Sequence, residues 1–275
     1  MTRVALFQST TGIDPAANAD ALEEAIGKAA AGGAEMLFTP EMSGLLDRDS
    51  ARAAKSLSDE DEDKVLERCR EAARKHGIWL HIGSLAVLVE DGKVANRGFV
   101  IDREGEIRAR YDKIHLFDVD LPTGESWRES NVYSAGKGVI LVNGTPVGKL
   151  GLTICYDLRF PGLFARLAEA DADIIAVPAA FTVPTGKAHW HILLRARAIE
   201  AGLFVVAAAQ VGRHEDGRQT FGHSLVVDPW GEVLLDMGEK PGVGFADIDL
   251  KRISDVRGRI PALNHRRTIP DAVTL

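Results

Sequence analysis

Short apolar strand patterns alternate with amphipathic helix patterns along the chain, and this alternation restricts the fold to the α/β class. The first half predicts, in order, a strand, a helix, a strand, a helix and two paired strands. These elements are expected at 4–8, 15–31, 36–39, 59–76, 79–89 and 97–102. Asp14 and Pro15 are typical of a helix start, and the pair Gly32-Gly33 ends that helix.

The second half repeats this scheme. Strands are expected at 149–156, 173–177, 203–210 and 243–248, helices at 161–170 and 185–201, and a hairpin at 224–227 and 232–235. The segments EMLFTPEM and DIIAVPAA each follow a helix, which suggests an internal two-fold repeat. No Ser/Pro-rich linker or shift in composition divides the chain. We therefore expect one domain over 1–275, with a core at about 4–250 and a C-terminal tail at 251–275.

Charge and cysteine content exclude several classes of protein. The chain has 275 residues and a net charge of −7, which argues against a nucleic-acid partner despite the basic residues of 251–267. No apolar stretch is long enough to cross a membrane, and MTRVALFQST lacks the apolar segment and cleavage site of a secretory signal. Two cysteines, Cys69 and Cys155, cannot form a disulfide scaffold, so we expect a reduced, cytoplasmic setting.

Polar residues just beyond strand ends are the candidates for chemistry, because ligands of α/β sheets gather there. Cys155 ends an apolar strand and precedes a turn into a helix, where free N–H groups lower a thiol pKa and stabilise an oxyanion. The alternative reading of Cys155 is a buried core residue. Cys69 lies on the apolar stripe of the helix at 59–76 and is expected in the core.

Glu41 and Lys113 are the charged candidates. Burial of Glu41 among apolar neighbours would raise its pKa and suit it to general-base catalysis, and the alternative is an exposed loop acid or a helix cap. Lys113 beside a cysteine would lower the thiol pKa and stabilise a tetrahedral oxyanion, and the alternative is a surface lysine.

Four segments in chain order resemble the signature segments of the nitrilase, or carbon–nitrogen hydrolase, superfamily. They are Pro40-Glu41, YDKIHLF at 111–117, ESN at 129–131 and CYDLRFP at 155–161. The likeness extends from about 4 to 267 and is greatest for the Nit branch, the amidases that hydrolyse deaminated glutathione and related ω-amides. Further segments that suggest this branch are HW at 189–190, RARAIE at 195–200, AAAQ at 207–210, GRH at 212–214, GHS at 222–224, VDPWG at 227–231 and HRR at 265–267.

The resemblance implies a four-layer α-β-β-α sandwich that forms a homodimer or higher homo-oligomer through its helical face. It implies that Cys155 is the nucleophile, Glu41 the general base and Lys113 the charge that stabilises the tetrahedral intermediate. Glu129 would hold Lys113 or the substrate amide, and the backbone N–H of Tyr156 would complete the oxyanion hole. A small amide would then be cleaved through a Cys155 thioester with release of ammonia, with no metal or organic cofactor.

Substrates of this branch carry carboxylates, which a guanidinium binds through two hydrogen bonds. Arg159, four residues after Cys155, is the first candidate for this role, and a structural ion pair is its alternative. Phe181 and Thr182, in the loop after Pro178, are expected to line the pocket near the scissile amide.

Other functions stay open at this point. The substrate could instead be an N-carbamoyl amino acid, another aliphatic amide or a nitrile, or the chain could be an inactive binding subunit, although Glu41, Lys113 and Cys155 are all present. A Cys-His hydrolase would need a histidine as its base, but none of the eight histidines lies in a distinctive motif. His223 is expected to be a structural hydrogen-bond donor. His189 and His191 lie about 200° apart around a helix and cannot share a metal on one face. The glycines of 144–149 lack the spacing of a phosphate-binding loop.

Overall fold

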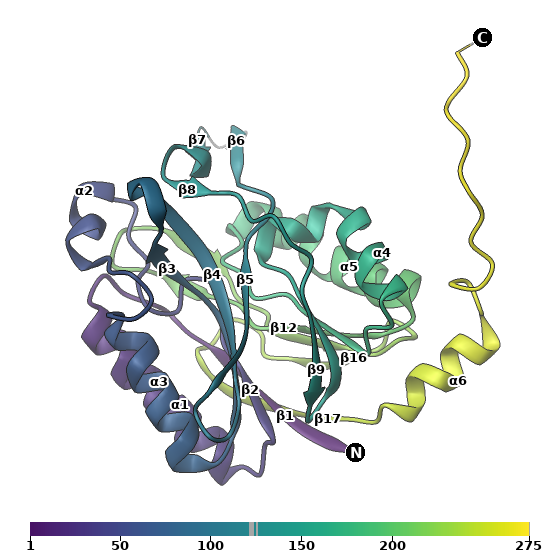
Figure 1. The fold of residues 1–275 in the computed structure, drawn as a ribbon, viewed down its shortest axis with the longest axis horizontal. Helices are drawn as coiled ribbons and strands as arrows, with labels where there is room; N and C mark the ends of the chain where they lie inside the picture. The colour runs from purple at the N-terminus through teal and green to yellow at the C-terminus, as the bar shows by residue number, and fades with distance from the viewer. Residues whose placement is uncertain (121–123, 125, 275) are drawn as a thin grey trace.

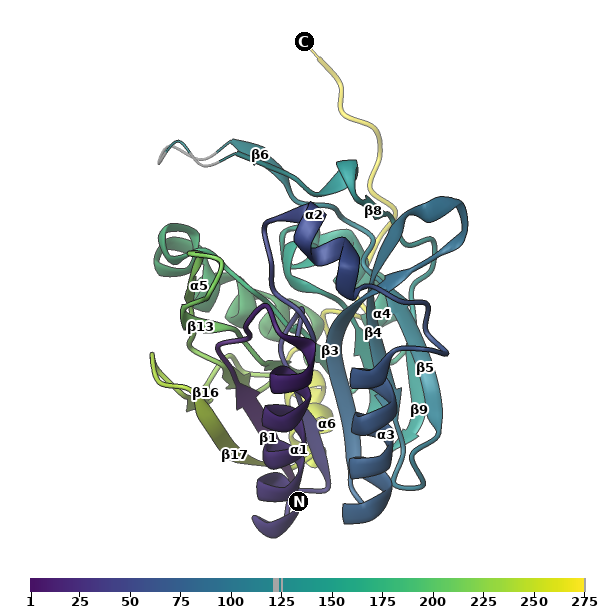
Figure 2. The same ribbon diagram turned by 90° about the vertical axis from the view of Figure 1, so that its left-hand side faces the viewer.

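The computed structural model describes residues 1–120, 124 and 126–274, and it contains two sheets packed face to face between two layers of helices (Figure 1). Helices α1 and α3 cover the outer face of the first sheet, and α4 and α5 cover the outer face of the second (Figures 1 and 2). This confirms the α/β class that the sequence pattern predicts and the α-β-β-α order of layers that the family resemblance implies.

The elements have the following bounds. The first sheet runs in the order β17 (Gly242–Ile248), β1 (Thr2–Gln8), β2 (Met36–Phe38), β3 (Trp79–Leu88), β4 (Val94–Ile101) and β5 (Ile107–Asp112), with β8 (Tyr133–Ser134) beside β4. The second sheet runs in the order β16 (Val233–Asp236), β15 (Leu225–Val227), β12 (Phe204–Ala207), β11 (Ile174–Ala176), β10 (Gly148–Leu152) and β9 (Leu141–Thr145). Two small ribbons pair β13 (Val211–Arg213) with β14 (Gln219–Phe221), and β6 (Asp118–Asp120) with β7 (Ser126–Arg128). The α-helices are α1 (Pro15–Ala31), α2 (Ser50–Ala53), α3 (Lys64–His76), α4 (Pro161–Glu169), α5 (Val183–Ala201) and α6 (Lys251–Arg259). The 3-10 helices are η1 (Ala54–Ser56), η2 (Glu90–Gly92), η3 (Glu129–Asn131) and η4 (Cys155–Arg159).

The two sheets share one topology, which explains the internal similarity of the sequence. In the first, β1, β2 and β3 are parallel and connected through α1 and α3, and antiparallel β4 and β5 follow. In the second, β10, β11 and β12 are parallel and connected through α4 and α5, and antiparallel β15 and β16 follow. An antiparallel strand also lies outside each first strand, β17 beside β1 and β9 beside β10.

Three apolar cores fill the spaces between the four layers, one on each outer sheet face and one between the sheets. Successive side chains of a strand point to opposite faces of the sheet, so neighbouring residues of one strand belong to different cores. In β1, Val4 and Leu6 belong to the core between the sheets, whereas Ala5 faces α1 and α3. Because strands such as β1 are covered on both faces, their sequences are almost continuously apolar.

Several boundaries differ from the sequence prediction. Helix α3 begins at Lys64 rather than 59, because the Asp63 side chain accepts the Leu66 N–H and caps it there. The strand predicted to extend to 156 ends at Leu152, so Cys155 lies in a turn rather than in the strand. The sequence prediction missed the strands β5 to β9, although β5 alternates apolar and polar residues.

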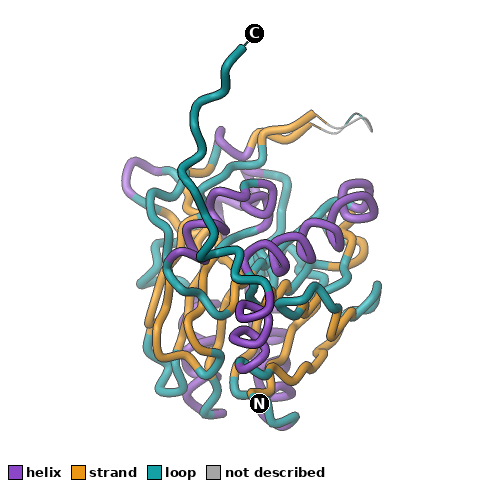
Figure 3. Tube along the Cα trace, turned by 90° about the vertical axis from the view of Figure 1, so that its right-hand side faces the viewer, coloured by secondary structure: helices purple, strands orange, loops and turns teal. Residues whose placement is uncertain are grey.

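The C-terminal segment predicted as a tail begins with a packed helix. Helix α6 buries Ile253 and Val256 against the body, and the chain beyond it extends away without helix or strand (Figures 1 and 3). Within the described ranges, every helix is too short or too polar to cross a bilayer.

One close approach fixes the chain that follows β2. A Cβ at Gly83 of β3 would overlap the carbonyl oxygens of Thr39 and Pro40 and the ring of Pro178. These residues precede Glu41 and the 179–182 loop, so the absence of a side chain at 83 lets β3 lie against the backbone of both segments.

We expect Gly83→Ala to lower the free energy of unfolding by about 2–3 kcal/mol, because backbone atoms must move to admit the methyl group. Gly162→Ala is the matched control, since a Cβ there meets open space at the start of α4. The control should be as stable as wild type, or up to about 1 kcal/mol more stable. Urea unfolding measures both, and equal effects would contradict the packing argument.

Candidate active site

A pocket of about 900 Å³ lies where the parallel strands of both sheets end, and residues of α2 and β7 are part of its lining. The segments that border it include the turn after β2, the end of β5, η4 and the loop after β11. The structure brings all eight residues that the sequence singles out to this pocket. They are Glu41, Lys113, Glu129, Cys155, Tyr156, Arg159, Phe181 and Thr182.

Lys113 is the centre of a buried ionic network. Its side chain is 2% exposed, and its Nζ donates to Glu41 Oε1 at 2.9 Å and to Glu129 Oε1 and Oε2 at 3.1 and 2.9 Å. Asn96 of β4 joins the same carboxylates, because its Nδ2 donates to Glu41 Oε1 at 3.0 Å and Glu129 Oε1 at 3.2 Å. The remaining oxygen of Glu41 accepts the Ala180 N–H at 3.0 Å. Both carboxylates are therefore held in fixed orientations beside the ammonium group.

Cys155 begins η4 in a left-handed backbone conformation, with φ of 49°. A residue other than glycine adopts this conformation only when its surroundings enforce it. Here the Cys155 N–H donates to Pro178 O at 2.8 Å, and the buried Asp157 side chain accepts the Ile154 N–H at 2.9 Å and the Tyr111 hydroxyl at 2.7 Å. These bonds fix the turn that directs Cys155 into the pocket that Glu41 also lines, where the Glu41 charge acts on its thiol.

The charges of this network set its protonation state. Burial raises the pKa of Glu41, but the Lys113 charge and hydrogen bonds from Lys113 and Asn96 outweigh it and leave that pKa below its ordinary value. Burial lowers the pKa of Lys113, yet Glu129 and Glu41 raise it well above its ordinary value. Burial and the Glu41 charge raise the pKa of the Cys155 thiol, and Lys113 offsets this only in part. The resting site thus holds a neutral thiol, an ionised Glu41 and a charged Lys113.

Two electrostatic expectations from the sequence therefore require correction. The pKa of Glu41 was expected to rise, but the compensating Lys113 and hydrogen bonds reverse the effect of burial. The thiol pKa of Cys155 was expected to fall, but Lys113 also faces two carboxylates, and burial with the Glu41 charge dominates.

The remaining predicted residues form a second wall of the pocket. The Arg159 guanidinium lies over the rings of Phe181 and Tyr156, with Cζ 5.4 and 6.0 Å from their centroids. Its Nη1 is 3.3 Å from His189 Nδ1, and over residues 1–120, 124 and 126–274 no carboxylate forms an ion pair with it. Thr182 is buried, and its hydroxyl bonds that of Thr185 at 2.8 Å. The ion pair offered as an alternative role for Arg159 is therefore not formed in the described structure.

Sequence reasoning missed Asn96 and Asp157, which orient the predicted residues. Asn96 is buried in β4, and a buried amide in a strand requires polar partners. Arg97 follows it directly, so the sequence does not mark this position as buried. Asp157 carried no signal either, because its role depends on Tyr111 and His115, which lie more than forty positions away in the chain.

One cluster outside the pocket has the composition of a metal site within the described residues. His191, His223 and Asp236 bring their ligand atoms within 4.8 Å of one another. The Asp236 carboxylate already accepts from His191 Nε2 at 3.0 Å and pairs with His223 Nδ1 at 2.9 Å, so the three groups satisfy one another. His189 lies on another side of α5, against Arg159, as the helical spacing predicts.

Comparison with known proteins places this geometry in a family. Residues 3–258 match the family model for carbon-nitrogen hydrolases. The chain is 40% identical over 276 residues to a deaminated glutathione amidase of Yersinia enterocolitica, covering 98% of this chain and 94% of that relative. The chain belongs to the carbon–nitrogen hydrolase family.

Two solved structures have the same fold. The NitFhit protein of Caenorhabditis elegans superposes with a TM-score of 0.89 at 40% identity, and the match covers 97% of this chain and 65% of that longer one. A mutant amidase from Nesterenkonia sp. AN1 superposes with a TM-score of 0.78 at 29% identity, covering 95% of this chain and 98% of that one. That structure shows the product of Michael addition of acrylamide at the active-site cysteine of the amidase.

The Glu41 charge should control the ionisation of Cys155. In a Cys69→Ala background, which leaves one thiol, Glu41→Gln removes the anion that raises the pKa of Cys155. The thiolate then forms at lower pH, and the midpoint of iodoacetamide alkylation against pH should fall by about one unit or more. Glu35→Gln, at an exposed position, should leave the midpoint in place. A midpoint that rises in Glu41→Gln would contradict the assigned electrostatics.

Proposed function

We propose that this carbon–nitrogen hydrolase is an amidase that forms a thioester on Cys155, with deaminated glutathione or a related carboxylate-bearing ω-amide as its substrate. The observation that carries the proposal is the buried triad, in which the Glu41 carboxylate accepts from the Lys113 ammonium and lines the same pocket as the Cys155 thiol. The names of the most similar relatives support the substrate class.

The resting protonation state suits the first step. Glu41 is ionised and accepts the thiol proton as Cys155 sulfur attacks the amide carbonyl carbon. The carbonyl π electrons move to oxygen, and the Lys113 ammonium and the Tyr156 N–H stabilise the resulting oxyanion. When the carbon–nitrogen bond breaks, the nitrogen takes the proton from Glu41 and leaves as ammonia or an amine.

The second half of the reaction hydrolyses the thioester and regenerates the free enzyme. Glu41 removes a proton from water as the water oxygen attacks the thioester carbonyl carbon, and the same donors hold the oxyanion. Collapse releases the carboxylic acid and returns the proton from Glu41 to the Cys155 sulfur. Glu129 takes no proton in this scheme, and its two hydrogen bonds from Lys113 keep the ammonium group charged and in position.

Arg159 is the proposed receiver of a substrate carboxylate near the reacting carbon. Its guanidinium lies on two aromatic faces at the pocket wall, so it is oriented without an acidic partner in the described part of the chain. Phe181 and Thr182, on the loop that supplies the Ala180 N–H to Glu41, line the same wall.

Replacement of the nucleophile tests the reaction. Cys155→Ala should lose at least about 10³-fold in turnover with an unchanged circular dichroism spectrum, because no thioester forms. The substrate panel contains deaminated glutathione, α-ketoglutaramate, succinamate, an N-carbamoyl amino acid and a simple nitrile, and mass spectrometry detects the released acid and amine. Turnover of the carbamoyl compound or the nitrile alone would contradict the amidase proposal. Full activity in Cys155→Ala would contradict the assignment of the nucleophile.

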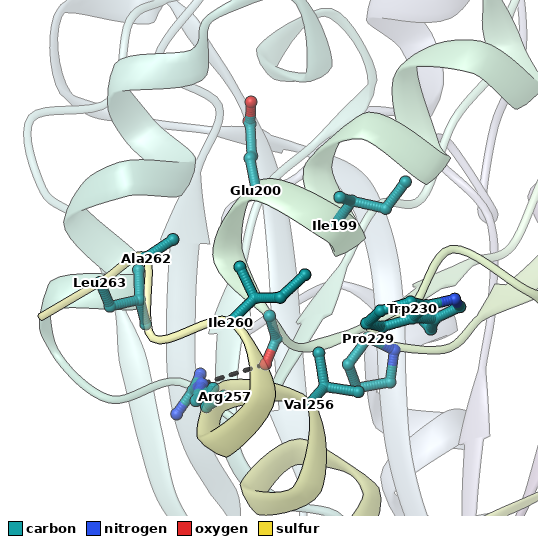
Figure 4. A pocket seen from close by; sticks show the side chains of 10 residues that line it. Ile199, Glu200, Pro229, Trp230, Val256, Arg257, Ile260, Ala262 and Leu263 are labelled. Carbon is teal, nitrogen blue, oxygen red and sulfur yellow. Dashed lines mark hydrogen bonds between the residues drawn. The ribbon is translucent and has the colours of Figure 1, made fainter. Parts of the chain in front are cut away.

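The chain is also proposed to act as one domain, as a homodimer and in the cytoplasm, where a reduced Cys155 is maintained. Dimerisation is supported by exposed apolar side chains on the outer helical face. Ile192 and Ile199, seven residues apart on one face of α5, are 69% and 53% exposed. Ile199, Trp230 and Ile260 border an apolar cavity of about 250 Å³ between α5 and α6 (Figure 4).

A charge placed on this face should separate the protomers. We expect wild type to sediment at twice 29.7 kDa and Ile199→Glu to sediment as a single chain, because a carboxylate cannot be buried there without a partner. Val139→Glu, at an exposed apolar position outside α5, is the control and should sediment like wild type. An Ile199→Glu variant that still sediments as a dimer would show that this face is not the dimer interface.

A further inference from the structure

The active-site pocket is basic although the protein is acidic. Six basic and three acidic side chains line it in a chain of net charge −7. Two of the acids, Glu41 and Glu129, form ion pairs with Lys113. The third, Asp47, forms an ion pair with Arg52 at 2.6 Å. The surplus positive charge therefore lies elsewhere in the lining, and it favours an anionic occupant.

Part of this surplus is concentrated around Trp127. The Arg218 and Arg48 guanidinium carbons lie 4.8 and 5.6 Å from the centroid of its ring. Both arginines approach a single acid, the fully buried Asp216 side chain, with Arg218 Nη2 at 3.3 Å and Arg48 Nε at 3.9 Å. Two cations thus share one carboxylate, and one positive charge at this position is uncompensated.

Hydrogen bonding at this cluster is also incomplete. Arg218 Nε and Trp127 Nε1 are buried N–H donors without a hydrogen-bond partner in the described part of the chain. Burial lowers the pKa of Arg218, and the Arg48 charge lowers it further, so the guanidinium is held in an unfavourable environment. Buried donors are normally satisfied, and exceptions mark sites that bind a ligand or are strained. A carboxylate supplies both the missing acceptor and the missing charge.

This cluster is separate from Arg159. Arg159 contacts Tyr156, Phe181 and His189. Arg218 and Arg48 instead contact Trp127 and Asp216. Because both groups line one pocket, a single substrate can engage both.

We propose that Arg218, Arg48 and Trp127 form a second carboxylate subsite, so that the preferred amide carries two carboxylates, one for Arg159 and one for this cluster. The inference rests on the proposed amidase function and narrows its substrate class. Deaminated glutathione, with a carboxylate at each end of the molecule and the scissile amide between them, has this chemistry. α-Ketoglutaramate and succinamate have one carboxylate and would leave the second subsite empty.

The test compares kcat/KM for deaminated glutathione and for α-ketoglutaramate in matched variants. Arg218→Lys keeps a charge but loses the planar donor pair, so we expect roughly a tenfold loss for the two-carboxylate amide, mainly in KM, and a much smaller loss for the other. Trp127→Phe removes the indole N–H and keeps the ring, with an expected loss of about threefold on the same substrate. Arg159→Lys should weaken both amides. Arg213→Lys, exposed and outside the pocket, should change neither.

Calorimetry on Cys155→Ala protein measures binding of deaminated glutathione without turnover, with and without Arg218→Lys. Roughly tenfold weaker binding in the double variant supports the subsite. Equal binding, or equal kinetic losses on both amides, would overturn it and leave Arg218 a structural residue. A wild-type enzyme that cleaves no amide would overturn the proposed function instead, and the calorimetric comparison would still decide the subsite.

Discussion

The buried ammonium group of Lys113 is the interaction on which the rest of the site depends. Removing a charge from water costs several kcal/mol unless partners replace the lost solvation. Lys113 finds those partners in Glu41 and Glu129, which come from the turn after β2 and from η3. Asn96 of β4 links the two carboxylates to each other. Because these groups are distant in the chain, the charge is stable only when the first sheet and its loops are fully assembled.

The site also requires both halves of the repeated topology. Glu41 and Lys113 follow strands of the first sheet, whereas Cys155 and the Ala180 N–H follow strands of the second. The Glu41 carboxylate spans this division, since one oxygen accepts from Lys113 and the other from Ala180. The packed core between the sheets therefore fixes the distance between the nucleophile and its charged partners. Close packing tolerates little change in that distance, and at Gly83 a Cβ would overlap the carbonyl oxygens of the two residues that precede Glu41.

The sequence predicted the fold well where periodicity and caps are local. Helix α1 has the predicted bounds, because Asp14 and Pro15 act within one turn. The Cys155 strand was predicted too long, because the turn depends on Asp157 bonding to Tyr111, a tertiary contact. The sequence motifs predicted which residues meet in the pocket, but not the protonation state. That state reflects the balance of burial against neighbouring charges, and no local pattern contains it.

The proposed reaction keeps the charge of the buried network constant. At rest, Lys113 is positive, Glu41 is negative and Cys155 is neutral. When the thiol proton moves to Glu41 and sulfur attacks, Glu41 becomes neutral and the substrate oxygen becomes negative. One negative charge has moved from one neighbour of Lys113 to another, and no net charge has been created in a region shielded from water. A thiolate formed before attack by loss of the proton to solvent would instead place an additional negative charge near Glu41 for as long as the pocket waits for substrate. The raised pKa of Cys155 is thus compatible with catalysis, because the proton leaves the sulfur only when the new anion forms within reach of Lys113.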